Sequence, residues 1–369
     1  MDDLSHDDFK LLLALQEQPL ASNSALARVV DVSQPTVTNR LKSLKEKLSL
    51  YNVHTDLDPD AISMELYDFV LDISTAENVK LLEKLCDEHP YTLYRAREFG
   101  RTSGLFVQFR IPKDTGFLLV ELMDSLKSRN LITGYKILKR SRNGPAPVYT
   151  TTSLAHWDYN AAKWEFDWEL WRKQLASSPT TLPEKPRRES VLSNLTELDI
   201  QLLAELTQDA RQRNSEIIEK IGLDKETHGL RQKVSRRLEF LKKEVVLGYR
   251  VFLNWEVFDT YHTFVFACKA SEENTARLYN NLDTNRIPFQ STYVILENGF
   301  FWAVQAPPSH FSVIGEIITE YSKERELLLL DYKTSEVYGL WDKTYDSKSK
   351  LWRTSIMSPE QILTAIDKP

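Results

Sequence analysis

Cysteines and long apolar segments are scarce in this chain of 369 residues. Its two cysteines, Cys86 and Cys268, each lie in an apolar stretch, and no run approaches the roughly 18 apolar residues of a membrane span. The first residues are acidic and lack the basic and apolar regions of a signal peptide. We therefore expect a cytoplasmic protein without a membrane partner. Its cysteines should be buried free thiols, with a disulfide between them as the alternative.

Motifs for catalysis and metal binding are also scarce. The seven histidines never lie three or four residues apart, so no helix carries a histidine pair for a metal. The eleven glycines form no phosphate-binding loop, and no Gly-x-Ser-x-Gly motif occurs. We therefore predict no catalytic residue, no metal and no cofactor, and expect that the protein is not an enzyme.

The net charge of −6 argues against a protein that coats nucleic acid without specificity, but a local basic surface remains compatible with DNA binding. Two segments carry such charge. Residues 34–47 hold four basic side chains and one glutamate, and residues 231–244 hold six basic side chains and two glutamates. The positive charge is thus concentrated in two places.

These basic segments belong to a repeat. Residues 37–45 read Val-Thr-Asn-Arg-Leu-Lys-Ser-Leu-Lys, and residues 234–242 read Val-Ser-Arg-Arg-Leu-Glu-Phe-Leu-Lys. In both, apolar residues recur at i, i+4 and i+7, which predicts a helix with one buried stripe. Two shorter helices are predicted before each, and three short helices with a basic third helix are typical of a helix-turn-helix DNA-binding unit.

The periodicity changes after each of these units. Alternating apolar and polar residues predict strands in the order β-α-β-β-α-β, which is the ferredoxin-like arrangement. In the first copy this includes strands near 91–97 and 104–111, a helix at 115–128 and a strand at 131–139. In the second copy we predict strand 262–269, helix 273–283, strands 289–296 and 299–306, helix 310–322 and strand 327–333.

Tryptophans mark a tail after each copy. Trp157 and Trp168 are eleven residues apart, as are Trp341 and Trp352, so we align these two pairs. Trp164, Trp168, Trp171 and Leu175 would share one helical stripe, and we expect it to cover a sheet or a neighbouring domain. Base stacking or ligand binding by these tails is the alternative.

The predicted fold class is α+β, a tandem repeat that forms a pseudo-dimer in one chain. Its domains are a winged helix-turn-helix (1–56), a ferredoxin-like effector domain (60–150), a Trp-rich helix with a Pro/Ser-rich linker (151–194), a second winged helix-turn-helix (195–254), a second ferredoxin-like effector domain (258–338) and a C-terminal tail with a short helix (339–369).

This pattern resembles the Lrp/AsnC (leucine-responsive, feast/famine) transcription regulators, most closely over residues 195–250. The resemblance implies a sequence-specific DNA-binding transcriptional regulator with double-stranded DNA as its partner. Members of that family usually carry one copy and pair as homodimers, so a homodimer of this chain is a further candidate assembly. Their effector domains often bind an amino acid at a Gly-x-x-Asp type turn. Here Gly104 and Gly299 are followed by apolar residues, which leaves the small-molecule effector unknown.

The candidate DNA contacts are the side chains off the buried stripes. Glutamine and asparagine pair with adenine, arginine pairs with guanine, and the remaining cations suit phosphates. Asn39 against Arg236, and Lys42 against Glu239, predict different base preferences and an asymmetric operator. The predicted DNA-binding residues are Gln34, Thr36, Thr38, Asn39, Arg40, Lys42 and Lys45 in the first copy, and Thr227, Lys233, Ser235, Arg236, Arg237 and Lys242 in the second.

Three alternatives stay open. Arg95, Arg97, Glu98 and Arg101 form either an anion site or a solvated surface. Some tandem relatives of the family decarboxylate sirohaem, and the residues that would serve such an enzyme here are His89, Arg95 and Arg97. A regulator that acts only by binding another protein would show no salt-dependent DNA binding.

Overall fold

The computed structural model describes residues 4–46, 49, 51–100, 103–185, 188–224, 227–254, 256 and 260–366. None of the helices in these ranges combines the length and the hydropathy that crossing a bilayer requires. The chain divides into two compact units, each built from three separate stretches. Unit 1 is Met1–Val53, Arg140–Pro186 and Tyr249–Leu329, and unit 2 is His54–Lys139, Arg187–Gly248 and Leu330–Pro369.

Each unit combines elements from both copies of the repeat. Unit 1 holds the first helix-turn-helix, the first tail and most of the second ferredoxin-like domain. Unit 2 holds the second helix-turn-helix, the second tail and the first ferredoxin-like domain. The compact units therefore do not follow the order of the domains along the chain.

The helix-turn-helix of unit 1 comprises α1 (His6–Glu17), α2 (Asn23–Val30) and α3 (Gln34–Glu46). Helix α1 begins in a capping box, in which the Ser5 hydroxyl accepts from the Asp8 amide and the Asp8 carboxylate accepts from the Ser5 amide. The Ser22 hydroxyl caps α2 by accepting from the Ala25 amide, without the reciprocal bond of a capping box. Strand β1 (Tyr51–Leu57) follows α3.

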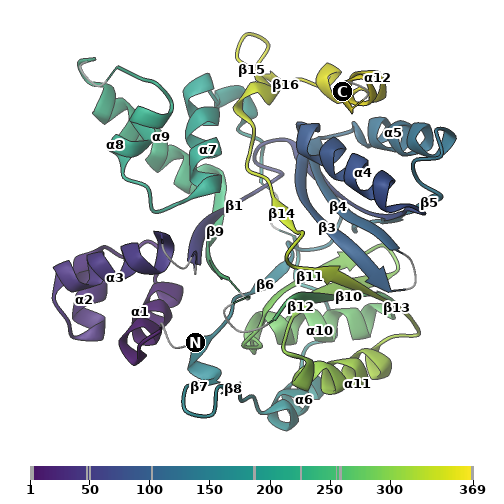
Figure 1. The fold of residues 1–369 in the computed structure, drawn as a ribbon, viewed down its shortest axis with the longest axis horizontal. Coiled ribbons are helices and arrows are strands. Elements are labelled where there is room, and N and C mark those ends of the chain that lie inside the picture. The colour runs from purple at the N-terminus through teal and green to yellow at the C-terminus, as the bar shows by residue number, and fades with distance from the viewer. Residues whose placement is uncertain are drawn as a thin grey trace. The chain divides into compact units, whose positions relative to one another are not determined.

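The ferredoxin-like domain of unit 1 is an antiparallel sheet in the order β13-β10-β12-β11-β6, with two helices on one face (Figure 1). The register pairs Trp302 with both Phe266 and Tyr293, and these three buried rings point to the helices. Residues 148–150, which we predicted as the end of the first effector domain, form β6 at the β11 edge. The elements are β6 (Val148–Thr150), β10 (His262–Lys269), α10 (Glu272–Thr284), β11 (Gln290–Leu296), β12 (Gly299–Gln305), the short 3₁₀ helix η4 (Pro308–His310), α11 (Phe311–Tyr321) and β13 (Glu324–Asp331).

The first tail covers the helices of this domain. It contains η1 (Leu154–His156), the hairpin β7 (Trp157–Asp158) and β8 (Lys163–Trp164), and helix α6 (Trp168–Ser177). Trp168 Nε1 donates to His310 Nδ1 at 2.9 Å, and Trp171 Nε1 donates to the Asn285 carbonyl at 2.7 Å. The tryptophans are thus packing residues, as expected, but Trp164 lies in a strand and not on the helical stripe.

The helix-turn-helix of unit 2 comprises α7 (Glu197–Gln208), α8 (Asn214–Lys220) and α9 (Leu230–Glu244), preceded by η2 (Leu192–Asn194) and followed by β9 (Val246–Leu253). A capping box again opens the first helix, here between Thr196 and Asp199.

The ferredoxin-like domain of unit 2 has the order β5-β2-β4-β3, with α4 and α5 over one face (Figure 1). Phe69 of β2 and Phe109 of β4 meet edge to face in its core. The second tail supplies β14, which pairs with β3. The elements are β2 (Met64–Asp72), α4 (Ala76–Glu88), β3 (Thr92–Gly100), β4 (Ser103–Pro112), α5 (Gly116–Ser128), β5 (Gly134–Leu138) and β14 (Glu336–Val337). The predicted α+β class and both ferredoxin-like domains are therefore confirmed.

The second tail continues through η5 (Asp342–Thr344), the hairpin β15 (Tyr345–Asp346) and β16 (Leu351–Trp352), η6 (Ser355–Met357) and α12 (Pro359–Ile366). The register pairs Tyr345 with Trp352, just as it pairs Trp157 with Trp164 in the first tail. Our alignment of Trp341 with Trp157 is therefore wrong, because the equivalent of Trp157 is Tyr345.

Candidate nucleic-acid interface

The third helix of each helix-turn-helix is held by one apolar stripe. Val37, Leu41 and Leu44 of α3 are buried, and so are Val234, Leu238 and Leu241 of α9. The two stripes have identical spacing, so α3 and α9 correspond residue by residue without a gap. Gln34 therefore corresponds to Arg231, and Asn39 to Arg236.

The turn before this helix differs between the copies. Helix α2 ends at Asp31, which has a left-handed backbone (φ 55°), and Gly222 (φ 72°) takes the same role after α8. In the second copy, Gly229 (φ 75°) then forms the N-cap of α9. Thr227, one of the predicted DNA contacts, is exposed in the turn before α9 and does not lie on the helix.

The open side of α3 is polar with little free charge. Gln34 and Asn39 are exposed, and the Lys42 ammonium lies 3.9 Å from the Glu46 carboxylate. The Thr38 hydroxyl accepts from Asn23 Nδ2 and donates to the backbone carbonyl of residue 34. Thr36 and Lys45 are half-buried at the edges of this side.

The open side of α9 carries far more charge. Lys233, Arg236 and Lys242 are exposed as predicted, and Ser235 is half-buried beside them. Our sequence analysis missed Arg231 and Gln232, which are exposed in the first turn of α9. Alignment of Val234 with Val37 would have found them, because it places Arg231 opposite Gln34. We define the basic face of α9 as four exposed side chains that form no hydrogen bond or ion pair with any residue the structure describes: Arg231, Lys233, Arg236 and Lys242.

Arg40 and Arg237, two further predicted DNA contacts, form ion pairs with carboxylates of the first helix of their domains. Arg237 donates from Nε and Nη2 to the two carboxylate oxygens of Asp199, each at 2.6 Å. Arg40 donates to Asp8 at 2.9 Å and to Asp7 at 3.2 Å. The hydrogen bonds that Arg237 donates to Asp199 also raise the pKa of the guanidinium. Both arginines thus join the third helix to the capping box of the first helix, and are engaged inside the domain.

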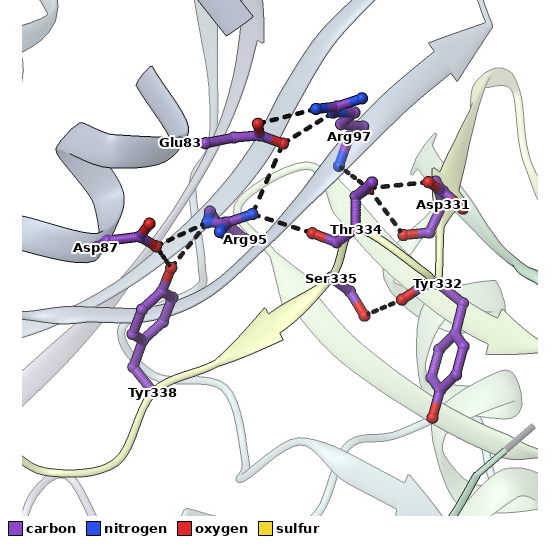
Figure 2. Close-up of polar contacts among 9 residues, drawn as sticks. All are labelled: Glu83, Asp87, Arg95, Arg97, Asp331, Tyr332, Thr334, Ser335 and Tyr338. Atoms are coloured by element: carbon purple, nitrogen blue, oxygen red, sulfur yellow. Dashed lines mark hydrogen bonds and ion pairs between the residues drawn. The ribbon is translucent and has the colours of Figure 1, made fainter. Parts of the chain in front are cut away.

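Arg95 and Arg97 of β3 are likewise engaged within unit 2 (Figure 2). Arg95 Nε donates to Asp87 at 3.1 Å and to the Tyr338 hydroxyl at 2.8 Å, and Nη1 donates to the Thr334 carbonyl. Arg97 donates twice to Glu83, at 2.8 and 2.9 Å. Arg95 and Arg97, for which we left an anion site and a solvated surface open, thus form an internal network that fixes the second tail to α4 and β3. Glu98 is buried, and Arg101 lies outside the described residues.

His89 is buried in the core of the same domain. Its ring lies 4.8 Å from the ring of Phe109, and its Nδ1 accepts from the Tyr91 amide. Burial lowers the pKa of His89 to about 3, so the ring is neutral at physiological pH. His89, Arg95 and Arg97 therefore do not form the open cationic site that a tetrapyrrole carboxylate would require.

Gly104, the second residue of β4, and Gly299, the first residue of β12, are required by packing. A Cβ at Gly104 would lie 1.8 Å from the Leu71 carbonyl oxygen, and one at Gly299 would lie 2.2 Å from that of Cys268. These glycines allow neighbouring strands to approach, which accounts for their presence without a ligand. Within the described part of the chain, no three histidine, cysteine, aspartate or glutamate side chains are grouped as metal ligands.

Comparisons with known proteins give two kinds of similarity. The model of the AsnC-type helix-turn-helix domain matches residues 1–45. The HTH-type transcriptional regulator AldR of Mycolicibacterium smegmatis is 32% identical over 78 residues, which are 21% of this chain and 45% of AldR. The chain thus spans less than half the length of that relative. The structure of E. coli AsnC covers 37% of the chain and 90% of its own at 17% identity, with a TM-score of 0.29.

The second similarity covers nearly the whole chain. The crystal structure of the siroheme decarboxylase NirDL matches 98% of this chain and 99% of its own, with a TM-score of 0.55 and 10% identity. A second structure of that enzyme, in complex with an iron-uroporphyrin III analogue, matches with a TM-score of 0.56. Our expectation that the protein lies outside the enzymes is therefore corrected, since its complete fold is one that an enzyme has.

The whole-chain similarity is one of fold, and the other similarity is confined to part of the chain. The helix-turn-helix match falls on α1, α2 and α3, where a capping box, a left-handed turn and a buried stripe build the domain. Residues 1–45 thus match the AsnC-type helix-turn-helix domain, and a stretch of 78 residues is similar to the transcriptional regulator AldR.

Proposed function

We propose that the protein is a sequence-specific DNA-binding transcriptional regulator that uses two non-identical helix-turn-helix units. The observation that carries this proposal is the basic face of α9. Its four cations are exposed and form no ion pair with the described residues, although unit 2 offers many carboxylates. Unpaired cations on the open side of a recognition helix are suited to phosphates and base edges in a major groove.

The two helices divide the contacts differently. Lys233 and Lys242 supply phosphate contacts from α9, and Lys42 and Lys45 supply them from α3. Base contacts come from the side chains near the start of each helix, because N-terminal residues of a recognition helix reach the base edges. Arg40 and Arg237 act indirectly, by fixing the rotation of α3 and α9 within their domains.

Salt dependence tests this proposal. Duplexes selected from a random pool should bind the full chain with an affinity that falls linearly with log salt, with a slope of about −0.9 for each phosphate contact. Lys233→Gln with Lys242→Gln should reduce the magnitude of that slope by about two. If the folded wild-type chain shows no salt-dependent DNA binding, the proposal is wrong, and a regulator that binds only protein is favoured.

The whole-chain likeness to siroheme decarboxylase favours a second candidate, a tetrapyrrole-binding activity. The contacts of His89, Arg95 and Arg97 argue against the site that the sequence suggests for it. Titration of the chain with iron-uroporphyrin III, followed by absorbance, tests this candidate directly. A saturable spectral shift at stoichiometric concentration supports it, and an unchanged spectrum removes it.

A further inference from the structure

The recognition helices share one frame but present different chemistry. The buried stripes align α3 with α9, and the Arg40–Asp8 and Arg237–Asp199 pairs occupy the same place in both domains. The positions off the buried stripes that differ between the two can therefore be compared one by one. They pair Gln34 with Arg231, Thr36 with Lys233, Asn39 with Arg236 and Lys42 with Glu239.

Two of these differences have a direct chemical meaning. Gln34 and Asn39 are carboxamides, which form paired hydrogen bonds with the N6 and N7 atoms of adenine. Their equivalents, Arg231 and Arg236, are guanidinium groups, which form paired hydrogen bonds with the O6 and N7 atoms of guanine. The same exchange of carboxamide for guanidinium thus occurs at two exposed positions of the helix, five residues apart.

The arginines of α9 are free to make these contacts. The guanidinium groups of Arg231 and Arg236 have no hydrogen bond or ion pair with a described residue, whereas that of Arg237 is held by Asp199. Lys233 and Lys242 flank them and can neutralise phosphates, which leaves the planar guanidinium groups for base edges.

We propose that the two helix-turn-helix units bind half-sites of different composition. Helix α3 selects adenine through Gln34 and Asn39, and α9 selects guanine at the equivalent positions through Arg231 and Arg236. This inference rests on the proposed DNA-binding function, and it identifies Arg231 as a specificity-determining residue. The operator is then a composite of an adenine-bearing and a guanine-bearing half-site.

An exchange of side chains tests the proposal in the full chain. Arg231→Gln with Arg236→Asn gives α9 the carboxamides of α3. In selection from a random DNA pool, the guanines of one half-site should be replaced by adenines. Binding to duplexes that differ only at those positions should change its preference by about 5- to 150-fold per position.

The reverse exchange, Gln34→Arg with Asn39→Arg, should introduce guanine into the other half-site, and it keeps the test decisive if the first variant fails to fold. Lys233→Gln with Lys242→Gln is the matched control, because loss of phosphate contacts should weaken binding to all sequences equally. A folded exchange variant that binds with unchanged base preference would overturn the inference and leave DNA binding standing. Absence of salt-dependent binding by the wild-type chain would instead remove the proposed function.

Discussion

Arg237 and Asp199 form a two-bond ion pair that joins the last and first helices of the second helix-turn-helix. Asp199 has no exposed surface and also accepts from the amide and the hydroxyl of Thr196. One carboxylate therefore both caps α7 and sets the position of α9. Asp8 and Arg40 repeat this arrangement in the first copy. The recognition helices are thus oriented by a charge pair as well as by apolar packing.

Removal of Arg237 should therefore reduce stability. Arg237→Ala leaves the buried Asp199 carboxylate without its partner, which should lower the free energy of unfolding by about 3 kcal/mol. Arg236→Ala, on the exposed neighbour, should change it by less than about 0.5 kcal/mol. Chemical denaturation followed by circular dichroism compares the two variants. Equal stabilities would show that the ion pair does not hold the domain together.

Arg236→Ala should instead affect DNA. The change removes one exposed, unpaired guanidinium from the basic face of α9, so affinity for a selected duplex should fall about tenfold while the fold is unchanged. Fluorescence anisotropy at fixed salt measures the effect. The control is Lys323→Ala, which removes an exposed charge outside the helix-turn-helix units. An equal loss of affinity in both variants would show that Arg236 acts only through the net charge of the protein.

The first tail gives a prediction about packing. Trp171 is 1% exposed and donates to the Asn285 carbonyl, so Trp171→Ala creates a cavity and leaves that carbonyl unpaired. We expect a loss of about 3–5 kcal/mol in the free energy of unfolding. Leu170→Ala is the matched control on the same helix, because Leu170 is largely exposed. A small effect at Trp171 would mean that α6 does not hold unit 1 together.

Local periodicity was sufficient to predict the main strands and helices of the ferredoxin-like domains. Strand 262–269 matches β10, and helix 115–128 begins one residue before α5, because alternation and 3.6-residue spacing are properties of neighbouring residues. The composition of the two units is set by long-range pairing. Strands β6 and β14 have only three and two residues, so the sequence contains too little pattern to show which sheet edge each one joins.

The site was predicted less completely for a related reason. An arginine on a recognition helix looks the same in sequence whether it faces DNA or a capping carboxylate 38 residues away, as Arg237 does. Arg231 was missed because the longer turn before α9 made the start of that helix uncertain. We misaligned the two tails because we matched them by their tryptophans. The signal that they share is an aspartate, Asp158 or Asp346, with a left-handed residue four positions later, Ala162 or Lys350.

Gly315 offers a stabilising change. It lies inside α11 at the wall of a cavity of about 640 Å³, and a Cβ there would meet no atom within 4 Å. Gly315→Ala should raise the free energy of unfolding by about 1 kcal/mol, because alanine favours a helix interior. Gly222→Ala should have the opposite effect, because its φ of 72° strains any side chain. Thermal denaturation of both variants gives the comparison, and a destabilised Gly315→Ala would contradict it.

The buried His89 should make the stability of unit 2 depend on pH. Its pKa is about 3 in the folded chain because of burial, against about 6.5 in the unfolded chain. Below pH 6.5 the unfolded chain binds a proton that the folded chain does not, so stability should fall as pH decreases toward 3. The slope from this one group reaches at most about 1.4 kcal/mol per pH unit. In His89→Asn the contribution of this histidine to the pH dependence of stability should disappear. Unfolding free energies measured between pH 7 and 4 should therefore decline less steeply than in the wild type. His228→Asn, at an exposed histidine, is the control, and parallel curves for all three proteins would show that His89 does not stay neutral in the fold.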